Sequence, residues 1–295
     1  MNVVFLPYLA SMWASMSPLY SEHVLNGDQV TVMPLPFTTR DRDGHPMTYR
    51  VDEGFPVPIQ NASIIQLREQ RPDRIYFHNP YDGTNTITQI EPHFFSKHLK
   101  ECTDDLTFVP YYTQGGDLPT IIRAPGVRNS DHVVVWSQVQ KDRYTSILCQ
   151  FSVDWARKII IKDRGIQRSY AIPPEWKAAA RGRKLIMLGT SLSAVLNDKA
   201  AELEKIHNTI MEHQNDQICL VWRPHPLYDA ALVAMLPSLY KPYRNMINAF
   251  IEYDQGILDT SADLERSVSV CQEYIGDPSS VVSFFIEQNK PVTII

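Results

Sequence analysis

The chain has 295 residues, of which 44% are hydrophobic and 21% are charged, and its formal net charge at pH 7 is −5. This composition is typical of a folded globular protein, and the length favours two domains over one. The negative net charge argues against a general nucleic-acid binder, which would carry a basic surface.

Cysteine usage and hydropathy indicate the compartment. The four cysteines have neither CxxC pairing nor zinc-ligand spacing, and they are Cys102, Cys149, Cys219 and Cys271. Reduced cysteine in apolar runs behaves as a small hydrophobe, so we expect a reducing cytoplasm. The apolar stretch from Val3 to Met16 has no basic region before it and contains Pro7, which favours a strand and a helix over a signal peptide. No run approaches the roughly 20 apolar residues of a membrane span, so we expect any membrane contact to be peripheral, at the inner face of the cell membrane.

Strand patterns alternate with helical patterns in the first half of the chain. Val3–Leu6 predicts a strand, Ala10–Leu25 a helix and Val30–Leu35 a second strand. Parallel strands need a crossover of this kind, so the three segments predict a βαβ unit. The polar segment Thr38–Asp52 predicts an exposed loop. The elements predicted next are helix Ile64–Arg71, strands Arg74–Phe77, Leu106–Val109 and Val133–Trp136, and helix Gln138–Leu148.

A change of composition in the middle of the chain predicts a linker. Two prolines in Ala171–Glu175 precede the basic run Arg181–Lys184, and the alternation of strands and helices then starts again. We therefore expect one domain over residues 1–172 and another over residues 183–295. The second domain is predicted to contain strands Lys184–Leu188, Ile218–Trp222, Phe250–Tyr253, Glu273–Ile275 and Val292–Ile295, with helices Asp198–His213, Leu232–Tyr240, Ala262–Val270 and Ser279–Gln288.

This order of elements predicts an α/β protein with two Rossmann-like, doubly wound domains. In such domains the carboxyl ends of the strands form the ligand-binding edge, and two of them in series would face a cleft, the arrangement called GT-B. The last predicted strand, Val292–Ile295, is not followed by a helical segment. We therefore expect the C-terminal crossover helix usual in GT-B proteins to be missing.

The segment Trp222-Arg223-Pro224-His225-Pro226 is the strongest candidate site. The apolar strand before it ends at two prolines that bracket His225, and proline fixes φ and has no backbone N–H, so the backbone there is rigid. Arg223 and a protonated His225 would suit a diphosphate, the first through charge-assisted hydrogen bonds and the second by presenting a proton-bearing ring nitrogen to the departing phosphate. A structural role for a single histidine is the alternative.

Two further strand ends in the second half carry hydroxyl groups. Asp277-Pro278-Ser279-Ser280 predicts a helix start with Asp277 as N-cap and Pro278 as first helical residue, so that free amides and hydroxyls at Ser279 and Ser280 would bind a phosphate. The alternative is an ordinary helix cap without a ligand. Gly189-Thr190-Ser191 predicts a second such loop, without the lysine of a P-loop, and a simple tight turn is equally compatible with it.

The first half offers a candidate base. His78 and Asp82 follow the strand Arg74–Phe77, and together they could activate a hydroxyl nucleophile, although a histidine satisfied near a turn is as compatible with the sequence. We expect Tyr111 and Tyr112 to fill the core rather than to line a site. No acidic pair has convincing metal-ligand spacing, since a basic residue separates Asp41 from Asp43, and we predict no metal site.

Several of these segments, taken in order, resemble the CDP-glycerol glycerophosphotransferase family, whose members include teichoic acid polymerases. The resemblance in the second half rests on Trp222–Leu227, Gly256–Thr260 with Asp263 and Leu264, Tyr274–Ser280 and Lys290–Val292. In the first half it rests on Val4–Tyr8 with Ser11–Trp13, and on His78–Asp82. The motifs of the second half are the more diagnostic ones.

The resemblance implies a GT-B fold and an activity. A CDP-glycerol donor would be held by the second domain, with His225, Asp277, Ser279 and Ser280 at its phosphates and Asp259 and Thr260 beside it. Glycerol phosphate would pass to a hydroxyl of a polymer or lipid-linked acceptor on the side of the first domain, and CMP would leave, in the synthesis of teichoic acid or a related cell-wall or capsule polymer. No cofactor besides the donor is expected, and the sequence leaves open whether a divalent metal assists. The alternatives are a GT-B glycosyltransferase that uses a nucleotide-sugar and a non-catalytic nucleotide-binding module.

Overall fold

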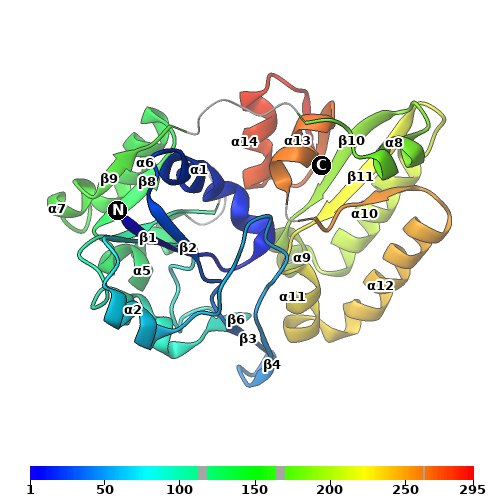
Figure 1. Cartoon of the computed structure of the whole chain (residues 1–295). Coiled ribbons are helices and arrows are strands. Elements are labelled where there is room, and N and C mark those ends of the chain that lie inside the picture. The colour runs from blue at the N-terminus through cyan, green and yellow to red at the C-terminus, as the bar shows by residue number, and fades with distance from the viewer. Residues whose placement is uncertain (112–117, 164–169, 262) are drawn as a thin grey trace. The chain divides into compact units, whose positions relative to one another are not determined.

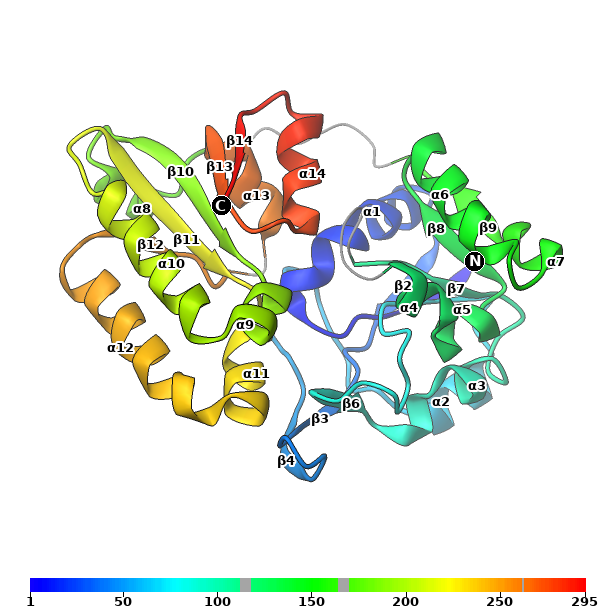
Figure 2. The ribbon, with the colours of Figure 1, turned by 180° about the vertical axis from the view of Figure 1, so that it is seen from behind.

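The computed structural model describes residues 1–111, 118–163, 170–261 and 263–295. These residues form two compact units, which we call unit 1 (the described residues up to 163) and unit 2 (those from 170). Each unit has its own parallel sheet (Figures 1 and 2). None of the helices in the described residues combines the length and the apolar character needed to cross a bilayer.

The main sheet of unit 1 is entirely parallel, with the strand order β2-β1-β5-β7-β8-β9. Its strands are β1 (Asn2–Leu6), β2 (Gln29–Val32), β5 (Arg74–Phe77), β7 (Leu106–Phe108), β8 (His132–Val135) and β9 (Ile159–Ile161). The apolar runs in β1, β5 and β8 are almost fully buried because helices and loops cover both faces of a parallel sheet. The predicted βαβ start of the chain is confirmed.

Short helices and 3₁₀ turns cover this sheet. Phe5 of β1 stacks on Tyr76 of β5 at 4.8 Å between ring centroids, and Trp13 packs edge-on against Phe5 at 6.1 Å. This aromatic group fixes the first helical segments on one face of the sheet. The helical elements are η1 (Ala10–Ser15), α1 (Ser17–Leu25), α2 (Ile64–Gln70), η2 (Pro92–Phe94), α3 (Ser96–Leu99), α4 (Leu118–Arg123), α5 (Pro125–Asn129), α6 (Gln138–Leu148) and α7 (Val153–Ala156).

The expected loop over Thr38–Asp52 is wrong, because this segment forms most of a small antiparallel sheet with the strand order β4-β3-β6. β3 (Phe37–Arg40) buries alternate residues, and β6 (Thr88–Ile90) buries both its ends against it. β4 (Pro46–Arg50) is an edge strand exposed along its whole length. Its polar composition reflects that exposure, which is why the sequence suggested a loop.

The sheet of unit 2 is also parallel, with the strand order β12-β11-β10-β13-β14. The chain starts in the middle at β10, moves outward on one side to β11 and β12, and then returns to the other side of β10. The topological switch point therefore lies between β10 and β13, where ligands bind in folds of this kind. The strands are β10 (Lys184–Thr190), β11 (Ile218–Pro224), β12 (Gly256–Leu258), β13 (Glu273–Gly276) and β14 (Val292–Ile294).

Successive side chains of β10 point to opposite faces of this sheet and form two cores. Ile186 and Leu188 lie in the core under α9, α10, α11 and α12, whereas Leu185 and Met187 lie in the core under α8, α13 and α14. Figures 1 and 2 show these two groups of helices on the two sides of the sheet. The helices are α8 (Pro174–Ala180), α9 (Leu192–Asp198), α10 (Ala200–Glu212), α11 (Tyr228–Met235), α12 (Pro237–Glu252), α13 (Leu264–Val270) and α14 (Ser280–Glu287).

Three expectations for this half need correction. The predicted strand Phe250–Tyr253 is wrong: Phe250 lies on the buried face of α12 together with Tyr243 and Ile247, at helical spacing. The single predicted helix Leu232–Tyr240 is divided into α11 and α12 at Leu236–Pro237. The expected linker contains α8, whose Trp176 is buried in the core of unit 2.

Candidate functional site

The carboxyl ends of three neighbouring strands in unit 2 bring most of the predicted donor-site residues to one edge. The register places Gly189 of β10 opposite Arg223 on one side and Gly276 on the other. The backbone N–H of His225 donates to the carbonyl of Thr190 at 3.0 Å, and that of Asp277 donates to the carbonyl of Gly189 at 3.0 Å. Because neighbouring strands lie about 4.8 Å apart, the His225 and Asp277 backbones are separated by roughly 10 Å, a distance that a nucleotide diphosphate can span.

Two glycines allow β10 and β13 to approach each other closely at this edge. Gly276 has a φ of 149°, and a Cβ atom there would lie 2.1 Å from the carbonyl oxygen of Gly189. A Cβ on Gly189 would in turn lie 2.4 Å from the hydroxyl of Tyr274. Neither position accepts a side chain in this backbone arrangement. The switch point is thus held tight just before the loops that carry Ser191 and Asp277.

His225 is half-buried and its ring is oriented by its own loop. The backbone N–H of Leu227 donates to Nδ1 of His225 at 3.1 Å. Since Nδ1 accepts this bond, the proton of the neutral ring is on Nε2, which is left as a donor. Burial lowers the pKa of His225 to about 4. The sequence predicts a protonated His225 beside a diphosphate, whereas in the ligand-free chain the ring is neutral at neutral pH and offers a neutral N–H.

The helix start after β13 differs by two residues from the expected one. Ser279, not Asp277, is the N-cap of α14, and Ser280 is its first helical residue. The side chain of Ser279 makes no capping bond to the helix, and the first N–H groups of a helix lack partners within it. The hydroxyl of Tyr274 donates to the carbonyl of Asp277 at 2.6 Å and lies 3.3 Å from Ser279 Oγ. Ser279 and Ser280 thus present hydroxyls and amides at a helix N-terminus, where an anion is stabilised.

The carboxylate of Asp277 is turned away from α14. It accepts a hydrogen bond from the backbone N–H of Ser191 and another from Lys205 Nζ at 2.6 Å, and Lys205 Nζ also lies 2.6 Å from Glu202 Oε2. Lys205 offsets part of the negative charge that would repel an anion at Ser279, because its one ammonium is shared by both carboxylates. Sequence reasoning missed both α10 residues. The helical spacing of α10 could have identified Glu202, which lies four positions before the buried Ile206 on the stripe that faces the core.

Arg223 does not fit the expected phosphate-binding role. Its NH1 group is ion-paired with the buried carboxylate of Asp259, and its NH2 group donates to the carbonyl of Ser261 at 2.8 Å. Asp259 also accepts bonds from the hydroxyls of Ser261 and Ser267, both at 2.6 Å. Burial raises the pKa of Asp259, but Arg223 and these serines outweigh it and leave the pKa below its usual value. The Arg223 charge is thus used to join β11 to the loop after β12.

The remaining predicted donor-site residues have mixed surroundings. Thr190 is buried, and its Oγ1 accepts a hydrogen bond from Trp222 Nε1 at 3.3 Å. Ser191 caps α9 by accepting the backbone N–H of Ala194 at 3.1 Å. Thr260 is exposed at the same edge of the sheet. The polar side chains of the loop after β10 are therefore used mainly for hydrogen bonds to other parts of unit 2.

In unit 1, His78 and Asp82 do not form the expected pair. The carboxylate of Asp82 accepts both the backbone N–H and the hydroxyl of Ser96, at 2.9 and 2.7 Å. His78 is fully buried and its Nε2 lies 2.8 Å from Ser15 Oγ. Ser15 donates its own proton to the carbonyl of Met12, so Nε2 of His78 carries the proton in this contact. Burial lowers the pKa of His78 to about 3, and the ring is neutral.

Of the two tyrosines that the sequence predicts to fill the core, Tyr111 and Tyr112, only the first lies within the described residues. Tyr111 is half-buried, with its ring centroid 6.5 Å from that of His78. Tyr112 lies outside the described residues.

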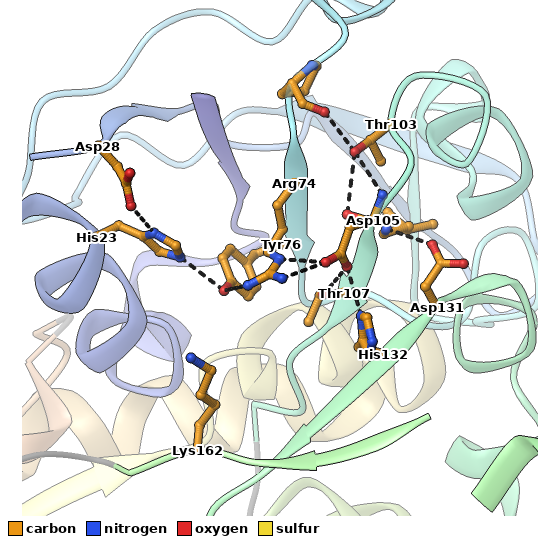
Figure 3. Close-up of polar contacts among 12 residues, drawn as sticks. His23, Asp28, Arg74, Tyr76, Thr103, Asp105, Thr107, Asp131, His132 and Lys162 are labelled. Atoms are coloured by element: carbon orange, nitrogen blue, oxygen red, sulfur yellow. Dashed lines mark hydrogen bonds and ion pairs between the residues drawn. The ribbon is translucent and has the colours of Figure 1, made fainter. Parts of the chain in front are cut away.

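A larger polar network lies at the opposite, amino edge of the unit 1 sheet (Figure 3). Asp105 precedes β7 and accepts bonds from Arg74 at the start of β5, from Thr107 and from His132 at the start of β8. Arg74 also donates to the hydroxyl of Tyr76, at 3.1 Å. Each of these groups has a partner, so the network reads as a structural connection between strands.

One group among the described residues has the spacing of metal ligands. Asp41, Asp43 and His45 place their ligand atoms within 4.8 Å of one another in the turn between β3 and β4. Asp41 Oδ1 accepts the backbone N–H groups of Asp43 and His45, at 2.9 and 2.8 Å. These bonds are those of a polar turn.

Comparison with known proteins places the chain by fold. No family model matches the sequence, and no curated protein is significantly similar to it. Among solved structures, the wall teichoic acid polymerase TagF is 13% identical, with a TM-score of 0.56 over 99% of this chain and 69% of that chain. The UDP-GlcNAc 2-epimerase of Methanocaldococcus jannaschii in complex with UDP-GlcNAc and UDP is 12% identical, with a TM-score of 0.63 over 100% and 83%. Staphylococcus aureus MnaA with UDP is 12% identical, with a TM-score of 0.55 over 99% and 78%.

At these identities the similarity shows the fold. The two parallel α/β units, in series along the whole chain, match proteins built from two Rossmann-like domains. The sequence-based prediction of the fold class is confirmed: the chain has a GT-B fold.

Proposed function

We propose that this chain is a transferase that uses a nucleotide diphosphate donor, and that the donor is CDP-glycerol. Glycerol phosphate would pass to a hydroxyl group of a polymer or lipid-linked acceptor, and CMP would be released. The donor would lie at the carboxyl edge of unit 2, between His225 after β11 and the start of α14 after β13.

One observation carries this proposal: two segments that can donate hydrogen bonds to a phosphate are both held by the carboxyl end of β10. His225 is tied to Thr190 and offers an N–H from Nε2, while Asp277 is tied to Gly189 and leads directly into Ser279 and Ser280. Asp277 and the start of α14 lie at the topological switch point between β10 and β13, where open α/β sheets bind ligands, and His225 lies at the same edge on the other side of β10. A diphosphate placed there would meet neutral donors and the positive end of a helix dipole.

The choice of CDP-glycerol rests on the motifs in the sequence. Trp222–Leu227 and Tyr274–Ser280 resemble those of the CDP-glycerol glycerophosphotransferase family, and the GT-B fold is compatible with it. One of the similar solved structures is a wall teichoic acid polymerase. The proposed acceptor is therefore a growing cell-wall or capsule polymer.

In the proposed reaction the acceptor oxygen attacks the β-phosphorus of CDP-glycerol. A new P–O bond forms, the bond between the β-phosphorus and the bridging oxygen breaks, and CMP leaves with that oxygen, while the acceptor proton passes to a base. Phosphoryl transfer depends mainly on positioning and on stabilising the spread negative charge. Nε2–H of His225 and the amides and hydroxyls at Ser279 and Ser280 would stabilise the charge on the transferred β-phosphoryl group and on the single phosphate of the leaving CMP.

A nucleotide-sugar enzyme is the second candidate, and a specific observation favours it. The M. jannaschii and S. aureus structures that share this fold contain UDP or UDP-GlcNAc. The same edge of unit 2 would then hold the diphosphate of a nucleotide-sugar. The chemistry would be sugar transfer or epimerisation instead of phosphoryl transfer.

Nucleotide release separates the two candidates. The purified chain is incubated with CDP-glycerol or with UDP-GlcNAc, each with and without a poly(glycerol phosphate) acceptor, and released CMP and UDP are measured. CMP release that depends on the acceptor supports the proposed transferase. Release of UDP only, or conversion of UDP-GlcNAc without any acceptor, supports the second candidate. Binding of CDP-glycerol without any CMP release indicates a non-catalytic nucleotide-binding module.

A further inference from the structure

Behind the proposed donor edge lies a buried group of two carboxylates that share one ammonium. We call Glu202, Lys205 and Asp277 the carboxylate cluster. The side chains of Glu202 and Asp277 are each 1% exposed, and that of Lys205 is 30% exposed. Lys205 Nζ lies 2.6 Å from an oxygen of each carboxylate. When all three are ionised, the cluster has a net charge of −1 in an environment that solvates charge poorly.

The cluster reaches the place where the donor phosphates would lie. Asp277 stands two residues before Ser279, the N-cap of α14, and its carboxylate also holds the backbone N–H of Ser191. A diphosphate at the start of α14 would therefore add negative charge next to a cluster that already has an excess of it. Like charges favour the protonated form of the carboxyl group that is least well compensated.

We propose that Glu202 takes up a proton when a nucleotide diphosphate binds beside Asp277, which leaves the neutral pair of Lys205 and Asp277 next to the bound phosphates. The inference rests on the proposed donor site, and it adds a proton-linked residue to that site. It does not depend on which group is transferred.

The contacts of the two acids identify Glu202 as the group that titrates. Asp277 accepts both a backbone N–H and the Lys205 ammonium, whereas the ion pair with Lys205 is the contact that stabilises ionised Glu202. Burial and the Asp277 carboxylate raise the pKa of Glu202 to about 7 although Lys205 lowers it. Burial lowers the pKa of Lys205, but the two carboxylates outweigh it and leave that pKa raised. Lys205 thus stays charged.

Other groups packed against Glu202 do not replace it as the titrating site. From α11, the buried hydroxyl of Tyr228 has no hydrogen-bond partner among the described residues, and burial raises its pKa far above the neutral range. From α12, Tyr243 lies against Tyr228 and is likewise neutral because burial raises its pKa. Asp198 and Lys199, at the end of α9 nearest to α10, are exposed.

Calorimetry measures the proton directly. CDP-glycerol is titrated into the purified chain at pH 7.5 in buffers of different ionisation enthalpy, and UDP-GlcNAc is used in the same way. Both probes are diphosphate diesters without a group that titrates near pH 7, unlike CMP or UDP, whose terminal phosphates have a pKa near 6. We expect uptake of up to about 0.7 proton per bound ligand, because a carboxyl group of pKa about 7 is mostly ionised at pH 7.5 before binding.

Two variants on the same helix make the test specific. Glu202→Gln should bind the probe at least as tightly at pH 7.5 with proton uptake near zero, since the amide resembles the protonated acid. Glu204→Gln, an exposed control two residues away, should keep the full uptake. If Glu202→Gln does not fold, the affinity of the unaltered chain decides: it should weaken as the pH rises above 7 and be constant below 6.

Each outcome has a distinct meaning. Binding with no proton uptake, or uptake that persists in Glu202→Gln and so points to His225, overturns the inference but leaves the donor site intact. Failure of both probes to bind at millimolar concentration removes the proposed donor site, and the inference with it.

Discussion

His225 and Arg223 are two residues apart at the end of one strand, and their surroundings give them different roles. Arg223 is buried and its guanidinium is joined to Asp259, whereas His225 is half-buried with Nδ1 occupied by a backbone N–H. A buried charge is retained only where a partner compensates it. The arginine therefore stabilises the fold of the edge, and the histidine is the residue with a donor left for a ligand.

Replacement of His225 tests its role as a neutral donor. His225→Ala should lower kcat/KM for CMP release by two or more powers of ten, because one lost donor typically costs about 3 kcal/mol of transition-state stabilisation. His225→Gln, which keeps an N–H donor, should lose less. Since the pKa of His225 is lowered to about 4, the rate should show no histidine-type decrease between pH 8 and pH 5. A His225→Ala variant with near-normal turnover would remove this residue from the mechanism.

Replacement of Arg223 should act on stability first. Arg223→Met leaves the Asp259 carboxylate buried without its cation and should lower the free energy of unfolding by about 3–5 kcal/mol. The double variant Arg223→Met with Asp259→Leu removes both charges and should recover much of the loss. Urea unfolding measures both. An Arg223→Met variant that unfolds like the parent chain but binds no donor would instead return Arg223 to the phosphate site.

Sequence reasoning at this scale identified positions better than roles. The prolines around His225 and the serines after Asp277 were visible because strand ends with such residues are rare and rigid. The pairing of Arg223 with Asp259 joins residues 36 positions apart, and no local pattern announces it. The expected pair of His78 and Asp82 was wrong for the same reason. Their spacing of four positions does not indicate their actual partners, which are Ser15 and Ser96.

At the scale of elements, the proposed ligand-binding edge of unit 2 depends on the close approach of β10 and β13. The carbonyl oxygen of Gly189 in β10 occupies the space that a side chain at Gly276 would need. The two strands can pair in this way up to the switch point only with glycine at that position. The loops that carry Ser191 and Asp277 begin immediately after it.

A methyl group at Gly276 therefore tests the geometry of the edge. Gly276→Ala should push β13 from β10, because its Cβ would lie 2.1 Å from the Gly189 carbonyl and because φ there is 149°. We expect a loss of stability of about 1–3 kcal/mol and a larger loss of donor affinity. The control Gly182→Ala, also at positive φ but with open space around the position, should lose stability without a comparable effect on binding. Equal effects of the two variants on affinity would contradict the role of this contact.

The elements that the sequence predicted well are those whose period is unambiguous. Buried parallel strands such as β1, β10 and β11 are continuous apolar runs, and they were found. β4 was missed because an edge strand exposed on all its residues has no apolar alternation. The sequence predicts a strand at Phe250–Tyr253 because a short apolar run has the same appearance at the end of a helix and in a strand.

At the scale of the whole molecule, each unit contains a histidine whose pKa is lowered by burial. His78 in unit 1 and His225 in unit 2 are neutral in the folded chain at neutral pH. In the unfolded chain both would titrate near pH 6.5. The unfolded state therefore binds more protons in mild acid, and folding loses free energy as the pH falls from about 6.5 towards the folded pKa values.

The two histidines should consequently add an acid sensitivity above the range of carboxylates, and Glu202, whose raised pKa makes the folded chain take up a proton over the same range, opposes it. For fully buried His78, the loss between pH 7 and pH 5 is about 2 kcal/mol, since one pKa unit corresponds to about 1.4 kcal/mol. Urea unfolding at the two pH values measures it. His78→Gln should reduce the difference between the two pH values, and His93→Gln, an exposed histidine of the same unit, should not. Identical differences in all three chains would contradict the burial of a neutral ring.

The two-unit α/β plan was predictable because the alternation of strands and helices starts again near residue 184. The strand orders of the two sheets were not, since sequence pattern does not specify which strands become neighbours. The cleft between the units and their separate donor and acceptor roles remain predictions.

Acceptor-dependent release of CMP from CDP-glycerol is the most direct test of the proposed donor site in unit 2. The unaltered chain should release CMP when acceptor is added, and His225→Ala should do so at least a hundredfold more slowly. An unaltered chain that neither binds CDP-glycerol nor releases CMP, under conditions where it is folded, would contradict the account.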